Sequence, residues 1–168
     1  MSRAKYFLIG LAALVFVFGG CQQYADYSDR QALRKLFGVP GEIQMQDYRG
    51  FAAIGGTFQR EGLKVSAIFA FTPQQAEQYL ESAVNNGWRP LPLPRDILAE
   101  SEKWGNLVNQ PQLRAKKGWY LLKTAGDNVL YNPNPRLCRK ASELRGDIIL
   151  GIFTPPDFKL WAAVASGY

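Results

Sequence analysis

The stretch LKVSAIFAFTPQQAEQYLESAVNNG, residues 63–87, decides the fold because its apolar period changes from two residues to that of a helix. In its first part alternate side chains are apolar: Leu63, Val65, Ala67, Phe69 and Phe71. Such alternation predicts a strand with one buried face. The preceding residues 48–58 are rich in Phe, Ala, Ile and Gly, and QREG at 59–62 separates the two runs. We therefore expect a β-hairpin with a four-residue connection.

Thr72 begins the helical part of this stretch. Pro73 suits the first helical position, and Gln75 lies where a capping box needs a side chain that reaches back to the cap residue. Gly87 provides the stop. Between them apolar residues recur at helical spacing, namely Ala76, Tyr79, Leu80, Ala83 and Val84. The pattern predicts an amphipathic helix directly after the strand.

Shorter elements are expected on both sides of this strand and helix. Residues 28–31 (SDRQ) resemble a capping box before an apolar run at helical spacing, which predicts a helix over 29–37. Residues 88–94 carry proline at every second position from 90 onward, so this segment should be an extended crossover. A further helix is expected over 95–103, followed by a polar loop.

The C-terminal part of the chain reads mainly as strands. Residues 119–124 and 129–131 can pair around a Gly-Asp-Asn turn, and 147–154 can pair with 158–165 around Pro-Pro-Asp. Strand pairs interrupted by one strong helix favour an α+β fold. We expect a single domain in which an antiparallel sheet carries one strong helix and one or two short helices on one face.

The first 21 residues have the layout of a secretory signal. Arg3 and Lys5 precede an uncharged apolar run at 6–18, whose 13 residues would reach about 20 Å as a helix, short of the roughly 30 Å hydrocarbon core of a membrane. The run ends at Phe18, and two glycines and Cys21 follow it. This arrangement resembles the lipobox of bacterial lipoproteins. The resemblance covers residues 1–21 alone.

Membership of the lipoprotein family would imply a lipid at the Cys21 thiol and removal of residues 1–20. Residues 21–27 would then be a short tether, and residues 28–168 the globular domain. The membrane would be a partner through the anchor. Gln22 is not the Asp that resembles an inner-membrane retention signal, so the resemblance implies an outer-membrane protein facing the periplasm.

Composition narrows the chemistry of the domain. The chain has 20 basic and 14 acidic residues, a net charge of +6 that falls to +4 once Arg3 and Lys5 are removed, and no histidine. Without histidine the usual general base and the commonest metal ligand are missing. We therefore expect no catalytic residue, metal or cofactor. Pairs of acids such as Glu100 with Glu102 leave a carboxylate-based hydrolase of cell-wall or lipid substrates as the alternative.

Cys138 would be the unpaired cysteine if Cys21 carries lipid. Free cysteine is among the most buried residue types, so a core position is favoured over a reactive thiol.

Two basic clusters are the candidate binding residues. The first cluster is Arg114, Lys116 and Lys117, and the second is Arg136, Arg139, Lys140 and Arg145. In a membrane-anchored domain such clusters favour an anionic partner, which could be an envelope protein, an anionic lipid or a cell-wall polymer, while nucleic acid is not expected. Solvated surface charge is the alternative reading of both. The sequence thus predicts a non-enzymatic binding or structural module of the envelope.

Overall fold

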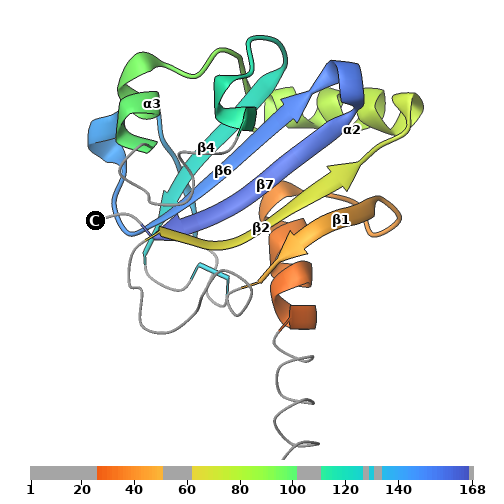
Figure 1. Ribbon diagram of the computed structural model, residues 1–168, viewed down its shortest axis with the longest axis horizontal. Helices are drawn as coiled ribbons and strands as arrows, with labels where there is room; N and C mark the ends of the chain where they lie inside the picture. Colours follow the sequence, from red (N-terminus) through yellow and green to blue (C-terminus); the bar gives the residue numbers. More distant parts are fainter. Residues whose placement is uncertain (1–25, 51–61, 102–110, 127–128, 131–133, 167–168) are drawn as a thin grey trace, which may run out of the picture.

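The computed structural model describes residues 26–50, 62–101, 111–126, 129–130 and 134–166 (Figure 1). Across these residues seven strands form one antiparallel sheet in the order β1-β2-β7-β6-β4-β3, with β5 paired to β4. This confirms the α+β class and the antiparallel sheet. The strands are β1 (Gln44–Arg49), β2 (Gly62–Ala70), β3 (Arg89–Pro90), β4 (Trp119–Ala125), β5 (Arg136–Leu137), β6 (Asp147–Thr154) and β7 (Lys159–Ser166).

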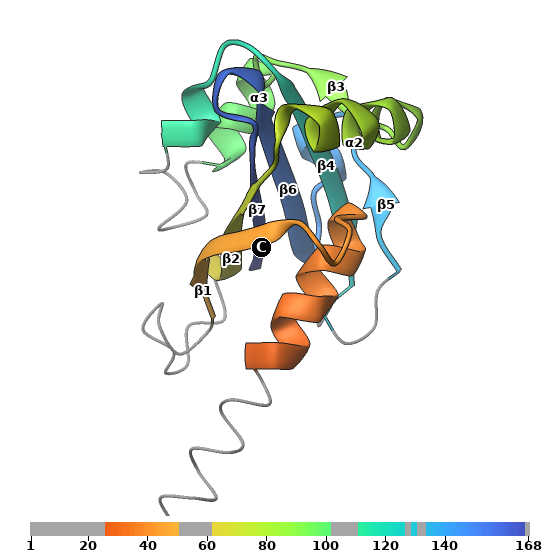
Figure 2. The same ribbon diagram turned by 90° about the vertical axis from the view of Figure 1, so that its right-hand side faces the viewer.

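The helices lie on both faces of the sheet, not on one as expected (Figure 2). They are the helix of residues 26–37, α2 (Pro73–Asn85) and α3 (Arg95–Ser101), with short 3-10 turns η3 (Pro111–Arg114), η4 (Ala141–Glu143) and η5 (Pro155–Asp157). The helix of 26–37 and α2 cover one face, and α3 with η3 covers the other. The reason is that the central strands carry apolar side chains on both sides: in β6, residues Ile148 to Phe153 are apolar or glycine and all are buried. Both faces of the sheet therefore need cover.

Each face has its own hydrophobic cluster. On the α2 face the sheet contributes Val65, Ala67 and Phe69 from β2 and Leu160, Ala162 and Val164 from β7. On the α3 face it contributes Ile148, Leu150 and Ile152 from β6 and Trp161, Ala163 and Ala165 from β7. This alternation follows from the two-residue period of a strand, which sends successive side chains to opposite faces.

The helix after β2 forms as predicted. Thr72 is its N-cap, with the capping box to Gln75 present in both directions, and Pro73 is its first residue. Ala76, Tyr79 and Ala83 are buried. The chain leaves α2 through Gly87, whose φ of +91° strongly favours glycine. Val84, expected on the apolar stripe, is instead exposed.

The first strand of the expected hairpin is displaced. β1 pairs antiparallel with β2, with Gln44 opposite Ala70, so the expected strand pair is present, but twelve residues, not the predicted four, separate the two strands. However, β1 ends at Arg49, whereas the prediction placed the strand at 48–58, and residues 51–61 lie outside the described part of the chain. β1 is an edge strand whose side chains are at most half-buried, so its sequence, QMQDYR, contains few apolar residues from which a strand could be predicted.

The helix of residues 26–37 begins earlier than expected, because residues 26 and 27 are already helical. Ser28 is therefore inside the helix and does not cap it, and the tether predicted to reach residue 27 cannot include these two residues. The spacing of a capping box also occurs within helices, where residues three apart share a face. The signal segment at 1–20, Cys21 and Gln22 lie outside the described residues.

The C-terminal strands are partly as predicted. β6 pairs with β7 around η5, which confirms that hairpin. The predicted partner of β4 was wrong, because residues 129 and 130 form a turn, and β4 pairs instead with β6, β3 and β5. Residues 88–94 form the expected extended crossover, with β3 and the buried Leu91 and Leu93. The helix predicted over 95–103 is present as α3, and residues 102–110 lie outside the described part.

Candidate functional site

The structure places the two basic clusters at opposite ends of β4. Arg114 ends η3, and Lys116 and Lys117 lead into the first residue of β4. Arg136 instead lies opposite Thr124, next to the last residue of β4. The seven residues of β4 span about 20 Å. The clusters are therefore two separate surfaces, and all seven cations are exposed.

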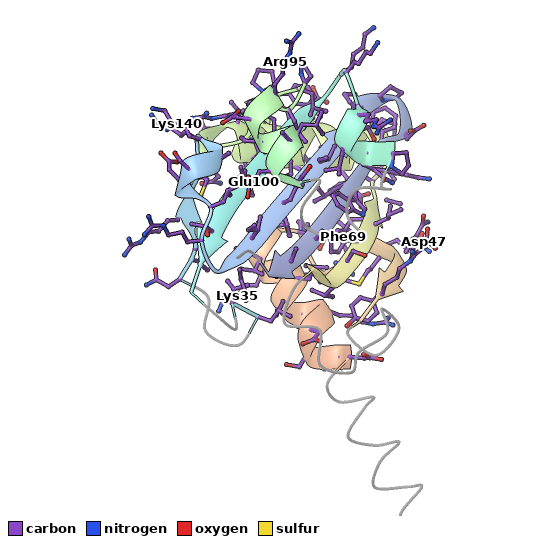
Figure 3. The ribbon with its side chains drawn as sticks, turned by 60° about the vertical axis from the view of Figure 1, so that its left-hand side comes forward. Lys35, Asp47, Phe69, Arg95, Glu100 and Lys140 are labelled. Atoms are coloured by element: carbon purple, nitrogen blue, oxygen red, sulfur yellow. The ribbon has the colours of Figure 1, made fainter. Side chains whose placement is uncertain are left out.

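Two residues of the second cluster, Arg136 and Arg145, line a surface groove of about 860 Å³, which we call the basic groove. Its lining includes Asn134, Arg136, Cys138, Ser142, Glu143 and Arg145. Arg139 and Lys140 belong to the same segment and are exposed, and Lys140 projects on the side of the molecule opposite Asp47 of β1 (Figure 3). Four cations thus gather along one ten-residue segment beside a single concavity.

Backbone hydrogen bonds to side chains fix the segment that carries these cations. The carboxylate of Glu143 accepts the N–H of Arg139 at 2.6 Å, and Asp96 of α3 accepts the N–H of Ala141 at 3.0 Å. These bonds are the main reason why the pKa of each carboxyl lies below its usual range. The N–H of Arg145 donates to the hydroxyl of Thr124 at 3.1 Å, which ties the end of the segment to β4.

Cys138 is buried, with 4% of its surface exposed, as the sequence suggested. It belongs to the hydrophobic cluster on the α3 face, and its Sγ lies 3.9 Å from the carbonyl oxygen of Arg136 and 3.8 Å from that of Glu143. Burial, and then the negative charge of Glu143, raise the pKa of the thiol. A raised pKa keeps the group as a thiol, which is a poor nucleophile.

A second concavity was missed by the sequence reasoning. It has a volume of about 330 Å³ and lies between the end of the helix of 26–37, α2, β4 and β5. We call it the lysine pocket, because Lys35 and Lys123 both line it, together with Ser82, Asn86, Trp88 and Leu137. The available signal was Lys123 itself, which stands two residues after Leu121 and two before Ala125 on the inward-facing side of an apolar strand.

Two of the described carboxylates, Asp96 and Glu143, do not suit the role of general acid in the hydrolase alternative. Asp96 and Glu143 are held ionised, which is opposite to the raised pKa of a general acid. Glu102 lies outside the described residues. Within the described ranges no group of three or more His, Cys, Asp or Glu side chains is placed to hold a metal ion. Among the helices described here, none combines the length and apolar character needed to cross a membrane.

Comparison with models of protein families, with curated proteins and with solved structures finds no match to this chain.

Proposed function

We propose that this protein is a lipid-anchored lipoprotein of the bacterial envelope that works as a non-enzymatic binding module and contacts an anionic envelope component through its basic groove. The observation that carries the binding role is the gathering of Arg136, Arg139, Lys140 and Arg145 beside one concavity. The proposed anchor rests on the resemblance of residues 1–21 to a lipoprotein signal.

Rigidity of the segment favours binding. Because Glu143 and Asp96 hold its backbone, the segment need not be ordered when a partner arrives, which lowers the entropic cost of association. Near an anionic surface each exposed Lys or Arg contributes about 1 kcal/mol. Four such residues are enough for selective contact, and the contact is weakened by salt because charges are screened within about 8 Å at physiological ionic strength.

The position of the anchor keeps the domain close to the membrane. Four residues separate Cys21 from residue 26, where the described helix is already formed. Even fully extended, this link reaches no more than about 18 Å. An acylated Cys21 would therefore hold the domain beside the head groups, and Gln22 favours delivery to the outer membrane.

Replacement of Cys21 by serine tests the anchor. The thiol is the atom that would carry the lipid, so Cys21→Ser should abolish acylation and leave either a released domain or an uncleaved precursor. Mass spectrometry of the protein extracted from membranes gives the result directly. An unmodified Cys21 in the wild-type protein would contradict the anchor.

Charge reversal tests the binding role, and the far cluster provides a matched control. The test variant changes Arg136, Arg139 and Lys140 to Glu, and the control changes Arg114, Lys116 and Lys117 to Glu. Both variants alter the net charge equally at exposed positions. In pull-downs from cross-linked cells, partner recovery should fall for the test variant, and should fall for the wild type as salt rises.

Equal recovery from the test and control variants at low salt would show that the basic groove has no special role. Purified protein that cleaves peptidoglycan or phospholipid would contradict the non-enzymatic part of the proposal.

A further inference from the structure

The lysine pocket and the basic groove have different lining residues in the described part of the chain, apart from Leu137, which they share. β5 lies between them, and its alternating side chains point to opposite faces of the sheet. Leu137 of β5 is paired with Lys123 of β4, and it lines both the lysine pocket and the basic groove. Arg136 and Cys138 line the basic groove. In Figure 2 the helix of 26–37 and α2 lie on the same side of the sheet, and β5 lies beside β4 at the margin of the sheet.

The charge of the pocket is positive and uncompensated within the described residues. Lys35 comes from the last turn of its helix and Lys123 from the middle of β4. The described residues that line the pocket include no carboxylate, and the ammonium group of Lys123 makes neither a hydrogen bond nor an ion pair with a described residue. Lys123 is half-buried, and this burial lowers the pKa of its ammonium group. A half-buried cation with no partner among the described residues favours the arrival of an anion.

The rest of the lining supplies a polar donor and an apolar wall. The amide of Asn86 donates to the backbone carbonyl oxygen of Ser82 at 2.9 Å and to its hydroxyl oxygen at 3.4 Å, which orients both side chains at the rim. Trp88 and Leu137 add apolar surface. The hydroxyl of Tyr79, which also lines the pocket, is already used in a hydrogen bond to the carbonyl oxygen of Phe37.

We propose that the lysine pocket binds a small organic oxyanion, in which a phosphate or carboxylate group lies between Lys35 and Lys123 and a compact apolar group packs against Trp88 and Leu137. The volume of about 330 Å³ is at the small end of the range for ligand pockets, so the ligand is a small molecule and not a polymer. This inference is independent of the partner proposed for the basic groove.

Calorimetric titration of the full chain in non-ionic detergent tests the proposal. The probes are phenyl phosphate, benzoate and inorganic phosphate, which separate the two anionic groups and measure the contribution of the ring. Phenyl phosphate or benzoate should saturate a single site and bind more tightly than inorganic phosphate. Lys123→Met should weaken the tighter probe about tenfold or more, since it removes one charged hydrogen bond.

Lys35→Gln is the second variant, because Lys35 is exposed and its replacement does not threaten folding. Like Lys123→Met, it should weaken binding of the tighter probe. Lys117→Gln and Arg136→Gln are matched controls that remove one charge at the far end of β4 and in the basic groove, and both should bind like the wild type.

Amide NMR of the same samples shows where the probe binds. Shifts should concentrate at Ser82, Asn86 and Lys123. The absence of saturable binding at millimolar probe, affinity unchanged in both Lys35→Gln and Lys123→Met, or shifts centred on Arg136 and Arg145 would each overturn the proposal.

Discussion

Tyr79 makes the hydrogen bond that joins the two helices on one face of the sheet. Its hydroxyl donates to the carbonyl oxygen of Phe37 at 2.6 Å, in a buried position, and the residue is 8% exposed. Phe37 is in the last turn of the helix of 26–37, where carbonyl groups lack helical partners. Burial also raises the pKa of Tyr79 well above its ordinary value, so the hydroxyl keeps its proton and stays a donor.

The substitution Tyr79→Phe removes this oxygen and keeps the ring. The ring packs against Phe71 and Trp88, at centroid distances of 5.0 Å and 6.0 Å, and these contacts should persist. The loss is then confined to the hydrogen bond and to the unpaired carbonyl that remains, which together cost about 1–3 kcal/mol. For a domain of this size that lowers Tm by about 3–10 °C.

Urea unfolding followed by far-UV circular dichroism measures the loss, and Tyr27→Phe is the matched control. Tyr27 lies in the helix of 26–37, which accepts the Tyr79 bond, but it is 62% exposed. Its hydroxyl is therefore open to water, and its removal should change the free energy of unfolding little. If Tyr79→Phe costs less than about 0.5 kcal/mol, as an ordinary surface substitution does, the bond between the helices does not stabilise the fold as argued.

Three further substitutions test the packing and charge of the same face by equilibrium unfolding. Thr72→Ala removes the capping box of α2 and should cost about 1 kcal/mol, and an unchanged midpoint would contradict this. Gly151→Ala brings a Cβ within 2.7 Å of the Phe37 ring and should cost about 1–3 kcal/mol, whereas Gly41→Ala, which meets no atom within 4 Å, should not. Lys123→Met should raise stability at neutral pH, because it removes a half-buried charge. The pKa of Lys123 is lower in the folded state, so between that pKa and 10.5 the unfolded state binds more protons and the wild type gains stability as pH rises. The stability advantage of Lys123→Met should therefore shrink over this pH range. A difference in stability that stays constant with pH would refute the charge argument.

Local signals in the sequence predicted the elements that depend on neighbouring residues. The cap at Thr72, the stop at Gly87 and the turn between β6 and β7 each rest on a few adjacent residues whose backbone preferences decide the outcome. The burial of Cys138 follows from its residue type in the same way. These features needed no knowledge of the rest of the fold.

Pairings between distant segments were harder to predict. Residues 129–131 looked like the partner of β4, but β6 pairs with all seven residues of β4. That choice depends on β6 being apolar on both sides, which suits a central strand and not an edge. The same property explains why helices cover both faces. The lysine pocket was missed for a related reason, since Lys35 and Lys123 are distant in sequence and meet only when β4 reaches the helix of 26–37.

Burial of the sheet on both sides also explains where the candidate binding residues lie. Between Asp147 and Phe153 every residue of β6 is buried, as is every residue of β7 from Leu160 to Ala165, so these stretches expose little side-chain surface, although Ile152 and Trp161 line a third concavity. Charged groups that reach solvent must come from the margins of the sheet. The two-residue strand β5 is such a margin. It pairs with β4 and lies between the basic groove and the lysine pocket. The N–H of Cys138 donates to the carbonyl oxygen of Leu122 at 3.0 Å and so extends the pairing of β5 with β4 by one residue. The shapes of both concavities therefore depend on this short strand pair.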